Sequence, residues 1–471
     1  MGDQTIVYRR RNHPYDLATS QPATGANMSN RFFPTVTKPI AFEGVGSDNP
    51  LAYKWYDAKR KVAGKTMEQQ LKFAVSFWHT FKGTGSDPFG GGVYDRPWNA
   101  SSDPMQRATD TMDAAFEFLH KLGAPYWCFH DRDISPEGAT VAESAGNLER
   151  IVQQAKKLQK TTGVKLLWGT ANLFSHARYT HGASTNPDPL VFAHGCAQVR
   201  HALDATVELG GTGYVFWGGR EGYSSLSNTD MKQEQAQFAR FLHMAHEYAQ
   251  KIGFNGRFFI EPKPKEPCTH QYDVDSATVL GFLREHGCYD FVDLNIENNH
   301  ATLAGHTFAH DLMVASQAGK LGSIDVNRGN PQLGWDTDQF PTVIEDAVWA
   351  MHIVLDQGGL KHGGLNFDAK VRRGSFDLDD LFIAHIGGMD AFARGLIIAD
   401  KMRQDGFRAK TLATRYAGWK QGFGAKALVG KATLEDGEAY AAKQGEPQRI
   451  SGREEHLENV FNQYIYDRSL R

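Results

Sequence analysis

The feature that most constrains the fold of this chain is a regular alternation of short apolar segments with longer segments of helical periodicity. The short segments are rich in aromatic and branched side chains, which favour β-strands. Strands that alternate with helices predict a parallel sheet, because each helix returns the chain to the same edge. Eight such apolar segments occur: 73–81, 126–130, 165–168, 214–217, 258–260, 292–296, 322–324 and 365–367.

Eight strand–helix repeats fit a closed barrel better than an open sheet. An open, doubly wound sheet usually carries a glycine-rich phosphate loop, GxGxxG, after its first strand. The glycine-rich segment 83–92 follows the first apolar segment here and does not match that pattern. We therefore predict an α/β fold, specifically a (β/α)8 TIM barrel with a C-terminal helical arm.

The segments between the apolar runs carry one apolar face at helical spacing. In residues 147–158 this face consists of Leu148, Ile151, Val152, Ala155 and Leu158. The same spacing predicts helices over 230–252, 276–286, 302–318 and 343–355.

Composition divides the 471 residues into three parts. Residues 1–39 begin as a polar, aperiodic stretch, for which we predict a flexible N-terminal extension. Residues 40–405 contain the eight repeats and form the predicted catalytic barrel. Residues 406–471 are polar and carry short helical patterns without a strand signal. We predict that they form a helical arm for oligomerisation; the alternative is a loosely attached tail.

Charge and composition argue against several classes of partner. A formal net charge of −3 and a pI near 6.7 offer no basic excess to neutralise a nucleic acid backbone. We find no apolar stretch that approaches the ~18 residues of a membrane span. The four cysteines are scattered and form no CxxC pair, which indicates a reducing compartment. We therefore expect a cytoplasmic protein that binds neither nucleic acid nor a membrane.

Several apolar segments end in an acidic residue. A carboxylate at the tip of a buried strand gains nothing from burial, whereas the carboxyl ends of barrel strands hold active-site residues. One such acid could be a helix N-cap, but four of them favour a functional cluster. The four acids are Glu261, Glu297, Asp325 and Asp368.

Three further residues extend this set: His300, one helical turn after Glu297, and the pair Asp336 and Asp338. Six carboxylates on one rim would repel one another and could not all ionise unaided. Oxygen ligands with a single imidazole suit Mg²⁺, Mn²⁺ or Co²⁺ better than Zn²⁺. Seven ligands are too many for one small ion that also holds a substrate. We therefore predict two divalent cations that share a bridging Glu.

Two basic side chains are candidates for proton transfer and substrate binding. His130 ends the second apolar segment, and Asp133 lies three residues later, where it can orient the ring. This arrangement is typical of a general base, although a lone histidine is usually structural. Lys263 lies between Pro262 and Pro264 on a stiff loop and could face a substrate oxygen. The alternative for Lys263 is a solvated surface residue.

Longer motifs around these residues resemble the D-xylose isomerase family, in its longer-chain subclass. The resemblance extends from about residue 40 to the C-terminus. The motifs, in order, are VFWGGREGY (215–223), IEPKP (260–264), HQYD (270–273), LNIE (294–297) followed by His300, GWDTD (334–338) and LNFDAK (365–370).

The resemblance implies a barrel with a C-terminal arm, assembled as a homotetramer. It implies interconversion of D-xylose and D-xylulose, and more weakly of D-glucose and D-fructose. The reaction in this family proceeds by ring opening and a metal-assisted hydride shift. Mg²⁺ is the expected cofactor, with Mn²⁺ or Co²⁺ as alternatives.

Carried over to this chain, the resemblance also assigns residue roles. His130, supported by Asp133, assists ring opening, and Lys263 binds the sugar oxygen O1. Phe89 is expected to reach the site of a neighbouring subunit. The structural ion takes Glu261, Glu297, Asp325 and Asp368; the catalytic ion takes Glu297, His300, Asp336 and Asp338; the pocket walls are Trp78, Thr170, Phe174 and Trp217.

Three other functions remain to be weighed. A glycoside hydrolase also places paired acids on a barrel rim, but it needs two acids and survives chelation. A phosphodiesterase-type nuclease would require more histidine ligands and a basic groove. A carbohydrate-binding protein with relict ligands would bind sugar without turnover.

Overall fold

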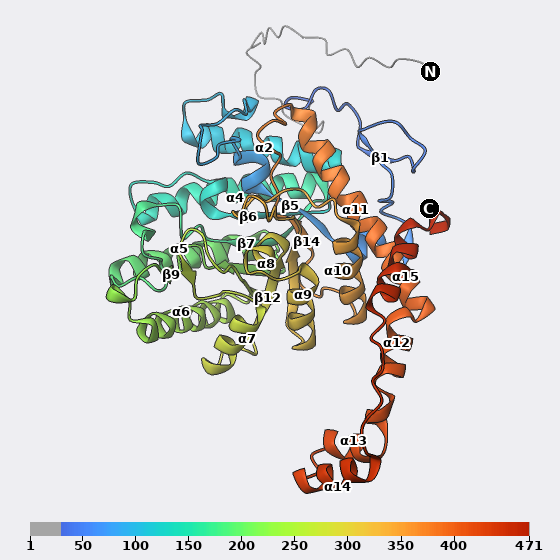
Figure 1. Cartoon of the computed structure of the whole chain (residues 1–471). Coiled ribbons are helices and arrows are strands. Elements are labelled where there is room, and N and C mark those ends of the chain that lie inside the picture. Colours follow the sequence, from blue (N-terminus) through green and yellow to red (C-terminus); the bar gives the residue numbers. More distant parts are fainter. Residues whose placement is uncertain (1–29, 471) are drawn as a thin grey trace.

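The computed structural model describes residues 30–470, and its centre is a closed barrel of eight parallel strands surrounded by helices (Figure 1). This confirms the predicted fold class. The strands follow one another around the barrel in chain order. They are β5 (Phe73–Ser76), β6 (Tyr126–His130), β7 (Lys165–Thr170), β8 (Gly213–Trp217), β10 (Arg257–Glu261), β12 (Val292–Glu297), β13 (Leu321–Asp325) and β14 (Leu365–Phe367).

One long helix follows each barrel strand and returns the chain to the opposite end of the barrel. Most of these helices begin at a side-chain cap, such as Asp103, Thr140 and Asp188, which satisfies a free N–H group of the first turn. The helices are α2 (Pro104–Leu122), α4 (Val141–Thr162), α5 (Pro189–Glu208), α6 (Met231–Lys251), α7 (Ser276–Glu285), α9 (Phe308–Gln317), α10 (Ile344–Asp356) and α11 (Leu378–Asp405).

Two predicted elements differ from the observed ones: a strand ends early, and a helix is broken in two. The first apolar segment, 73–81, is a strand only to Ser76, and Trp78–Lys82 forms a turn of π-helix at the barrel rim. The predicted helix 302–318 is broken into α8 (Asn298–Leu303) and α9. The break lies at Gly305, whose φ of +80° is a left-handed conformation that ends a helix.

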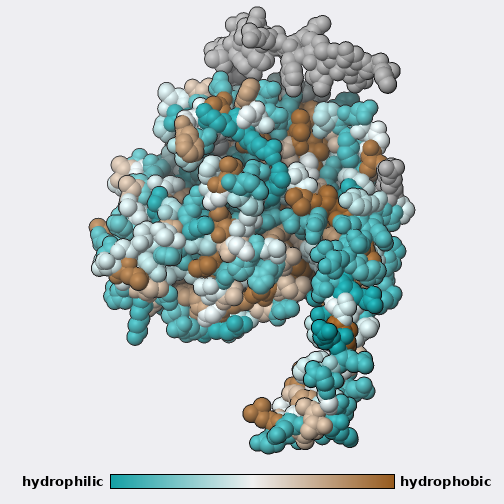
Figure 2. Space-filling model, viewed as in Figure 1, coloured by the Kyte–Doolittle hydropathy of each residue, from teal (hydrophilic) through white to brown (hydrophobic). Residues whose placement is uncertain are grey.

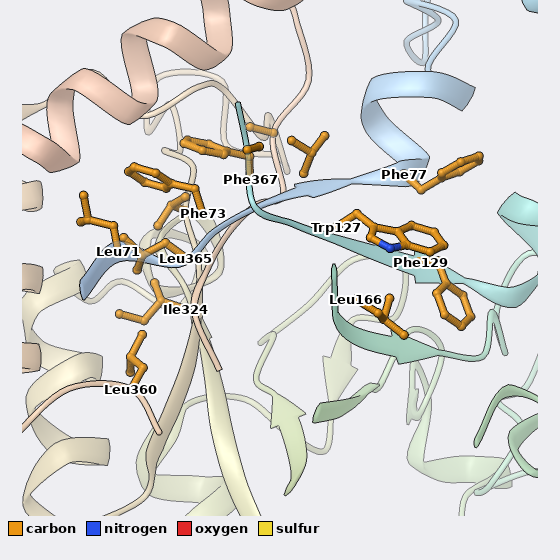
Figure 3. Packing of buried hydrophobic residues seen from close by; sticks show 14 of the residues in the cluster. Leu71, Phe73, Phe77, Trp127, Phe129, Leu166, Ile324, Leu360, Leu365 and Phe367 are labelled. Atoms are coloured by element: carbon orange, nitrogen blue, oxygen red, sulfur yellow. The ribbon is translucent and has the colours of Figure 1, made fainter. Parts of the chain in front are cut away.

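The apolar core lies in two layers. Between the strands and the outer helices, Phe73, Trp127 and Phe367 pack with neighbouring aromatic and aliphatic side chains (Figure 3). Inside the barrel, Phe259 fills the centre. A Cβ added at Gly213 or Gly322 would lie 2.5 or 2.4 Å from its ring, so these strands accept only glycine there.

The first described residues belong to the packed body. Phe32 and Phe33 are buried, and their backbone N–H groups donate to the Glu117 carboxylate on α2 at 3.0 and 3.1 Å. Burial of these two large aromatic side chains stabilises their packing on the barrel helices. The domain boundary at residue 40 stays a prediction. The rest of the predicted extension, residues 1–29, lies outside the described residues.

The last part of the chain forms α12 (Phe407–Arg415), α13 (Gly422–Leu428), α14 (Leu434–Gln444) and α15 (Glu454–Tyr466). Figure 1 shows α13 and α14 extending away from the barrel, whereas α15 lies back against it. Phe461 of α15 stacks on Trp349 of α10, with ring centroids 5.4 Å apart. Leu434, the first residue of α14, is exposed, and Figure 2 shows apolar surface at the tip of this arm. Its role in oligomerisation stays a prediction.

Helix α11 is long and apolar enough to resemble a membrane span, whereas the sequence analysis expected no such stretch. An 18-residue window of α11 has a mean hydropathy of 1.4, as in a membrane span. However, 78% of this window is buried inside the protein. The helix packs against α10 and the barrel, and its hydropathy reflects that core position.

The remaining elements are short. Three two-stranded pairs decorate the barrel: β1 (Ala41–Phe42) with β2 (Ala52–Tyr53), β3 (Lys61–Val62) with β4 (Lys65–Thr66), and β9 (Gly222–Tyr223) with β11 (His270–Gln271). The short helices α1 (Met67–Leu71) and α3 (Asp131–Ile134) precede β5 and follow β6.

Candidate active site

Strand register brings the predicted site residues to one level of the barrel. Glu297 pairs with Asp325 across β12 and β13, and His130 pairs with Thr170 across β6 and β7. Glu261 pairs with Trp217 in the same way. Each of these residues is the last of its strand, so all lie at the carboxyl end of the barrel, where TIM-barrel enzymes place their active sites.

Four buried carboxylates meet at this end. One oxygen from each of Glu261, Glu297, Asp325 and Asp368 lies within 4.8 Å of the others. Asn295 donates to Glu261 and Asp325, at 3.1 and 2.8 Å, and Asn366 donates to Asp325 at 2.9 Å. These amides hold the acids in place but supply no positive charge themselves. His79 contacts Asp368, and the remaining acids of the group are suited to a cation.

Burial and mutual repulsion make Glu261, Glu297 and Asp325 hard to ionise. Burial also opposes ionisation of Asp368, but the neighbouring His79 lowers the pKa of that carboxyl below its usual value. Burial, followed by the charge of Asp368, raises the pKa of Asp325 to about 8. The pKa values of Glu261 and Glu297 are also raised well above their usual range, first by burial and then by neighbouring carboxylates. A divalent cation would relieve this repulsion and favour the ionised forms.

We expect the metal-free protein to lose stability as the pH rises from about 4 to about 8. The folded pKa of Asp325, about 8, exceeds the unfolded value of about 3.9. The folded state therefore binds more protons than the unfolded state in this window, and stability falls with increasing pH. Thermal unfolding of the chelated protein across this range measures the slope. Asp325→Asn should flatten it, and an unchanged slope would contradict the assignment.

A second ligand group shares Glu297. Oxygens of Glu297, Asp336 and Asp338 lie within 4.8 Å of one another, and His300 joins Glu261 and Glu297 in the same way. Helix α8 begins directly after Glu297, which places His300 one turn later, with Nε2 3.1 Å from the Glu297 carboxylate and 3.4 Å from Asp336. Glu297 is thus the residue common to both groups.

The chemistry of this donor set fits two divalent cations. The donors are carboxylate oxygens with one imidazole, which are hard ligands. His300 Nδ1 is buried without a hydrogen-bond partner among the described residues. An orphaned ring nitrogen in such surroundings is unfavourable unless a further ligand satisfies it.

The structure also brings in polar residues that the sequence analysis missed. His79 Nε2 lies 2.9 Å from Asp368 and 3.2 Å from Asp338. Although burial opposes protonation, these two carboxylates raise the pKa of His79 to about 9. Its position was missed because residues 73–81 were interpreted as one strand. Asn327 donates to Glu297 at 2.7 Å and to the Asp368 carbonyl at 2.8 Å.

One sequence signal could have identified two of the supporting amides. Asn295 and Asn366 stand two residues before Glu297 and Asp368. Residues two apart on a strand share a face, so a polar residue at that position of a buried strand faces the same acid cluster.

A cavity of about 150 Å³ lies against the ligand groups. Its aromatic wall includes Phe174, whose ring meets Trp217 edge-on at 4.5 Å, and Trp78, whose ring centroid is 4.2 Å from that of His130. Six predicted ligands border it. The predicted residues that line the cavity are Trp78, His130, Thr170, Phe174, Trp217, Glu261, Glu297, His300, Asp336, Asp338 and Asp368.

The other predicted residues lie around this cavity. Asp325 is fully buried beneath it. Asp133 accepts a hydrogen bond from His130 Nδ1 at 2.8 Å, which leaves Nε2 as the second ring nitrogen for a ligand. The hydrogen bond between His130 and Asp133 is the one expected from their spacing of three residues.

Lys263 is buried rather than solvated. Its Nζ lies 2.5 Å from Asp336 and 5.2 Å from the centre of the Trp217 ring. Burial would lower the pKa of this amine, but the Asp336 carboxylate raises it above the usual range. The side chain therefore stays charged beside the ligand groups.

Phe89 lies outside the cavity of its own chain. Its side chain is exposed, with its ring 6.2 Å from that of Trp335. Both belong to loops around a wider mouth of about 650 Å³ that shares Trp78 and Asp336 with the cavity. The predicted reach of Phe89 into a neighbouring subunit stays a prediction.

Comparison with known proteins places this chain among close relatives. It is 59% identical over 437 residues to "Xylose isomerase 2" of Xanthomonas campestris pv. campestris (strain 8004), covering 93% of this chain and 98% of that protein. It is 58% identical to "Xylose isomerase" of Xanthomonas oryzae pv. oryzae (strain MAFF 311018), with coverage of 93% and 98%. Residues 412–465 match the family described as XylA2 C-terminal domain.

Solved structures give more distant similarities. An L-ribulose 3-epimerase is 14% identical, with a TM-score of 0.47, covering 70% of this chain and 96% of that chain. A D-psicose 3-epimerase with D-tagatose from Clostridium cellulolyticum H10 is 12% identical, with a TM-score of 0.48 and coverage of 69% and 99%. The sequence relatives carry the assignment. With 59% identity along nearly the whole chain, this protein belongs to the xylose isomerase family.

Proposed function

We propose that this protein interconverts D-xylose and D-xylulose, and more weakly D-glucose and D-fructose. The observation that carries the proposal is Glu297, which joins two buried ligand groups at the edge of a cavity walled by aromatic rings. Such a site can hold the oxygens of a small polyol on one side and exclude water on the other.

In this proposal one cation would be held by Glu261, Glu297, Asp325 and Asp368, and another by Glu297, His300, Asp336 and Asp338. Mg²⁺ is the best match to these ligands, with Mn²⁺ and Co²⁺ as alternatives. When bound, the two cations supply Lewis acidity toward the sugar oxygens and a template for the open chain.

The protein's own residues open the ring and hold the sugar. His130, oriented by the 2.8 Å hydrogen bond to Asp133, accepts the proton of the anomeric hydroxyl as the bond between C1 and the ring oxygen breaks. The ring oxygen takes up a proton and becomes the hydroxyl of the open chain. The Lys263 ammonium donates to O1, for which it must exchange its contact with Asp336. A hydride then moves from C2 to C1 of the open chain. The O2 hydroxyl gives up its proton as C2 becomes the carbonyl carbon, and O1 takes up a proton as C1 becomes the alcohol carbon, so no proton or electron is gained or lost overall.

The aromatic walls protect the open-chain sugar. Trp78, Phe174 and Trp217 surround the cavity beside the ligands, where their flat faces can pack on the C–H groups of the sugar. Excluding water prevents proton exchange with the solvent.

The rival functions predict different behaviour. A glycoside hydrolase needs two carboxyl groups and no metal, and a relict binding protein would bind sugar without turnover. The nuclease alternative requires a basic groove, whereas the cavity is bordered by five carboxylates.

We expect chelation to abolish aldose–ketose conversion and Mg²⁺ or Mn²⁺ to restore it, because the buried acids repel one another without a counter-ion. The measurement is conversion of D-xylose to D-xylulose by the chelated protein before and after metal is added back. Full activity in the presence of chelator would favour a metal-free hydrolase and contradict the proposal.

We also propose a cytoplasmic homotetramer in which residues 406–471 connect subunits. All four cysteines are free thiols, which supports a reducing compartment.

Phe89→Ala should lower kcat/KM about tenfold if this ring completes a neighbour's pocket, because the loss of one aromatic contact is worth roughly 1.5 kcal/mol. Leu226→Ala, another exposed apolar residue, is the control. A fully active monomer in sedimentation would contradict the assembly.

A further inference from the structure

A second cluster of metal-ligating side chains lies outside the active site. Nitrogen and oxygen atoms of His306, His310 and Asp311 lie within 4.8 Å of one another. Asp275 joins them from a neighbouring helix, with Oδ2 3.5 Å from His306 Nε2. These residues do not line the cavity described above.

The helix starts explain why these residues meet. Asp275 caps α7, and its carboxylate accepts from the Thr278 N–H at 2.8 Å. Thr307 caps α9, so His310 and Asp311 lie in its first turn. Ser276 Oγ donates to the Asp311 carbonyl at 3.1 Å and holds the two helix starts together.

The His306 ring lies between two carboxylates. Its Nδ1 is 3.7 Å from Asp311 Oδ1, and its Nε2 is 3.5 Å from Asp275 Oδ2. Both distances exceed the roughly 2.7–3.2 Å of an ordinary N–H···O hydrogen bond. Neighbouring ligands of a tetrahedral Zn²⁺, each at about 2.0–2.2 Å, are about 3.3–3.5 Å apart. The Asp311 contact is therefore a few tenths of an ångström from that spacing.

The two ring nitrogens of His306 face the two kinds of partner that a metal-bound histidine usually has. A histidine that binds a metal through one nitrogen usually donates its other N–H to a carboxylate, which fixes the ring. Here Nδ1 faces the Asp311 side of the cluster and Nε2 faces Asp275.

We propose that His306, His310 and Asp311 bind one transition-metal dication of the Zn²⁺ class, with Asp275 orienting His306. Two imidazoles and one carboxylate suit Zn²⁺ better than Mg²⁺. Asp311 is buried, His306 is half-buried and His310 is exposed, so the ion can enter from solvent and keep a water ligand. The ion would link His306, which lies between α8 and α9 and six residues after His300, to the first turn of α9. This site is independent of the proposed sugar chemistry.

The test compares zinc stoichiometry between matched variants. The folded full-length protein is dialysed against buffered Zn²⁺ in excess Mg²⁺, and bound zinc is counted by mass spectrometry. His306→Ala/His310→Ala should bind one zinc fewer per chain than the wild type. His120→Ala, an exposed histidine on α2, should bind as the wild type does. Any zinc in the active site is common to all three proteins and cancels.

Two single variants show whether lost zinc binding reflects misfolding, and they separate the role of the ligand His310 from that of the orienting residue Asp275. His310→Ala changes an exposed side chain and should weaken zinc binding at this site by at least about tenfold. Asp275→Asn keeps the helix cap, because Asn caps as well as Asp, and should weaken zinc about 10–100-fold without changing the stoichiometry. Equal zinc binding by wild type and His310→Ala would overturn the site and leave an ion-pair network. Unchanged affinity in Asp275→Asn would overturn its orienting role.

Discussion

Glu297→Gln is expected to lower turnover of D-xylose by about 10³-fold or more and to weaken both cations. The carboxylate lies within 4.8 Å of ligand atoms from both groups, so its loss removes a charged ligand from each. Loss of a single electrostatic contact in a water-excluded site already costs about 10²–10³-fold. Metal titration of the chelated protein, followed by the rate at saturating metal, measures both effects.

Asp338→Asn is the matched control for the shared ligand. Asp338 belongs to only one of the two groups, beside Asp336 and Glu297, and it also accepts from Lys370 at 3.0 Å. Its replacement should mainly weaken the second ion and leave the first bound. If Glu297→Gln lost one ion only, as Asp338→Asn is expected to do, Glu297 would not be a bridge.

His130→Asn is expected to lower kcat on cyclic D-xylose by about 10²–10⁴-fold, the usual contribution of a general base, with little change in substrate binding. His130 lines the cavity and donates through Nδ1 to Asp133 at 2.8 Å. Asn keeps a polar side chain of similar reach but cannot take up the proton of the anomeric hydroxyl. Steady-state rates and sugar binding measure the two effects separately.

A three-carbon aldose distinguishes ring opening from the later hydride shift. D-Glyceraldehyde is too short to close a five- or six-membered ring, so it bypasses the step assigned to His130. The variant should therefore retain most of its wild-type rate on this substrate while it fails on D-xylose. Equal losses on both substrates would assign His130 to the shift itself, and unchanged turnover of D-xylose would remove its catalytic role.

Asp133→Asn offers a graded control for the same step. Asp133 touches the ring only through Nδ1, so the amide still holds the ring but no longer stabilises its protonated form. We expect a loss smaller than that of His130→Asn, with the same dependence on the substrate.

The sequence by itself determined the barrel and most of its rim. Strand and helix periodicities depend on neighbouring residues, so eight apolar segments are sufficient to predict eight strands. Once the strands are parallel, their carboxyl ends meet, and acids at those ends such as Glu261 and Glu297 must lie together. Asp336 and Asp338 lie on a loop beyond the reach of periodicity, and they entered the predicted set as an acidic pair.

Only the tertiary structure decided the contacts between residues far apart in the chain. His79 meets Asp368 across 289 positions, and Lys263 meets Asp336 across 73. No local pattern encodes such pairs, because they depend on how the rim loops fold over the closed barrel. The cluster of Asp275 and His306 also depends on tertiary structure, because β10 and β12 must pair before the start of α7 meets the connection between α8 and α9. Periodicity specifies the elements, whereas closure of the barrel determines which side chains share a site.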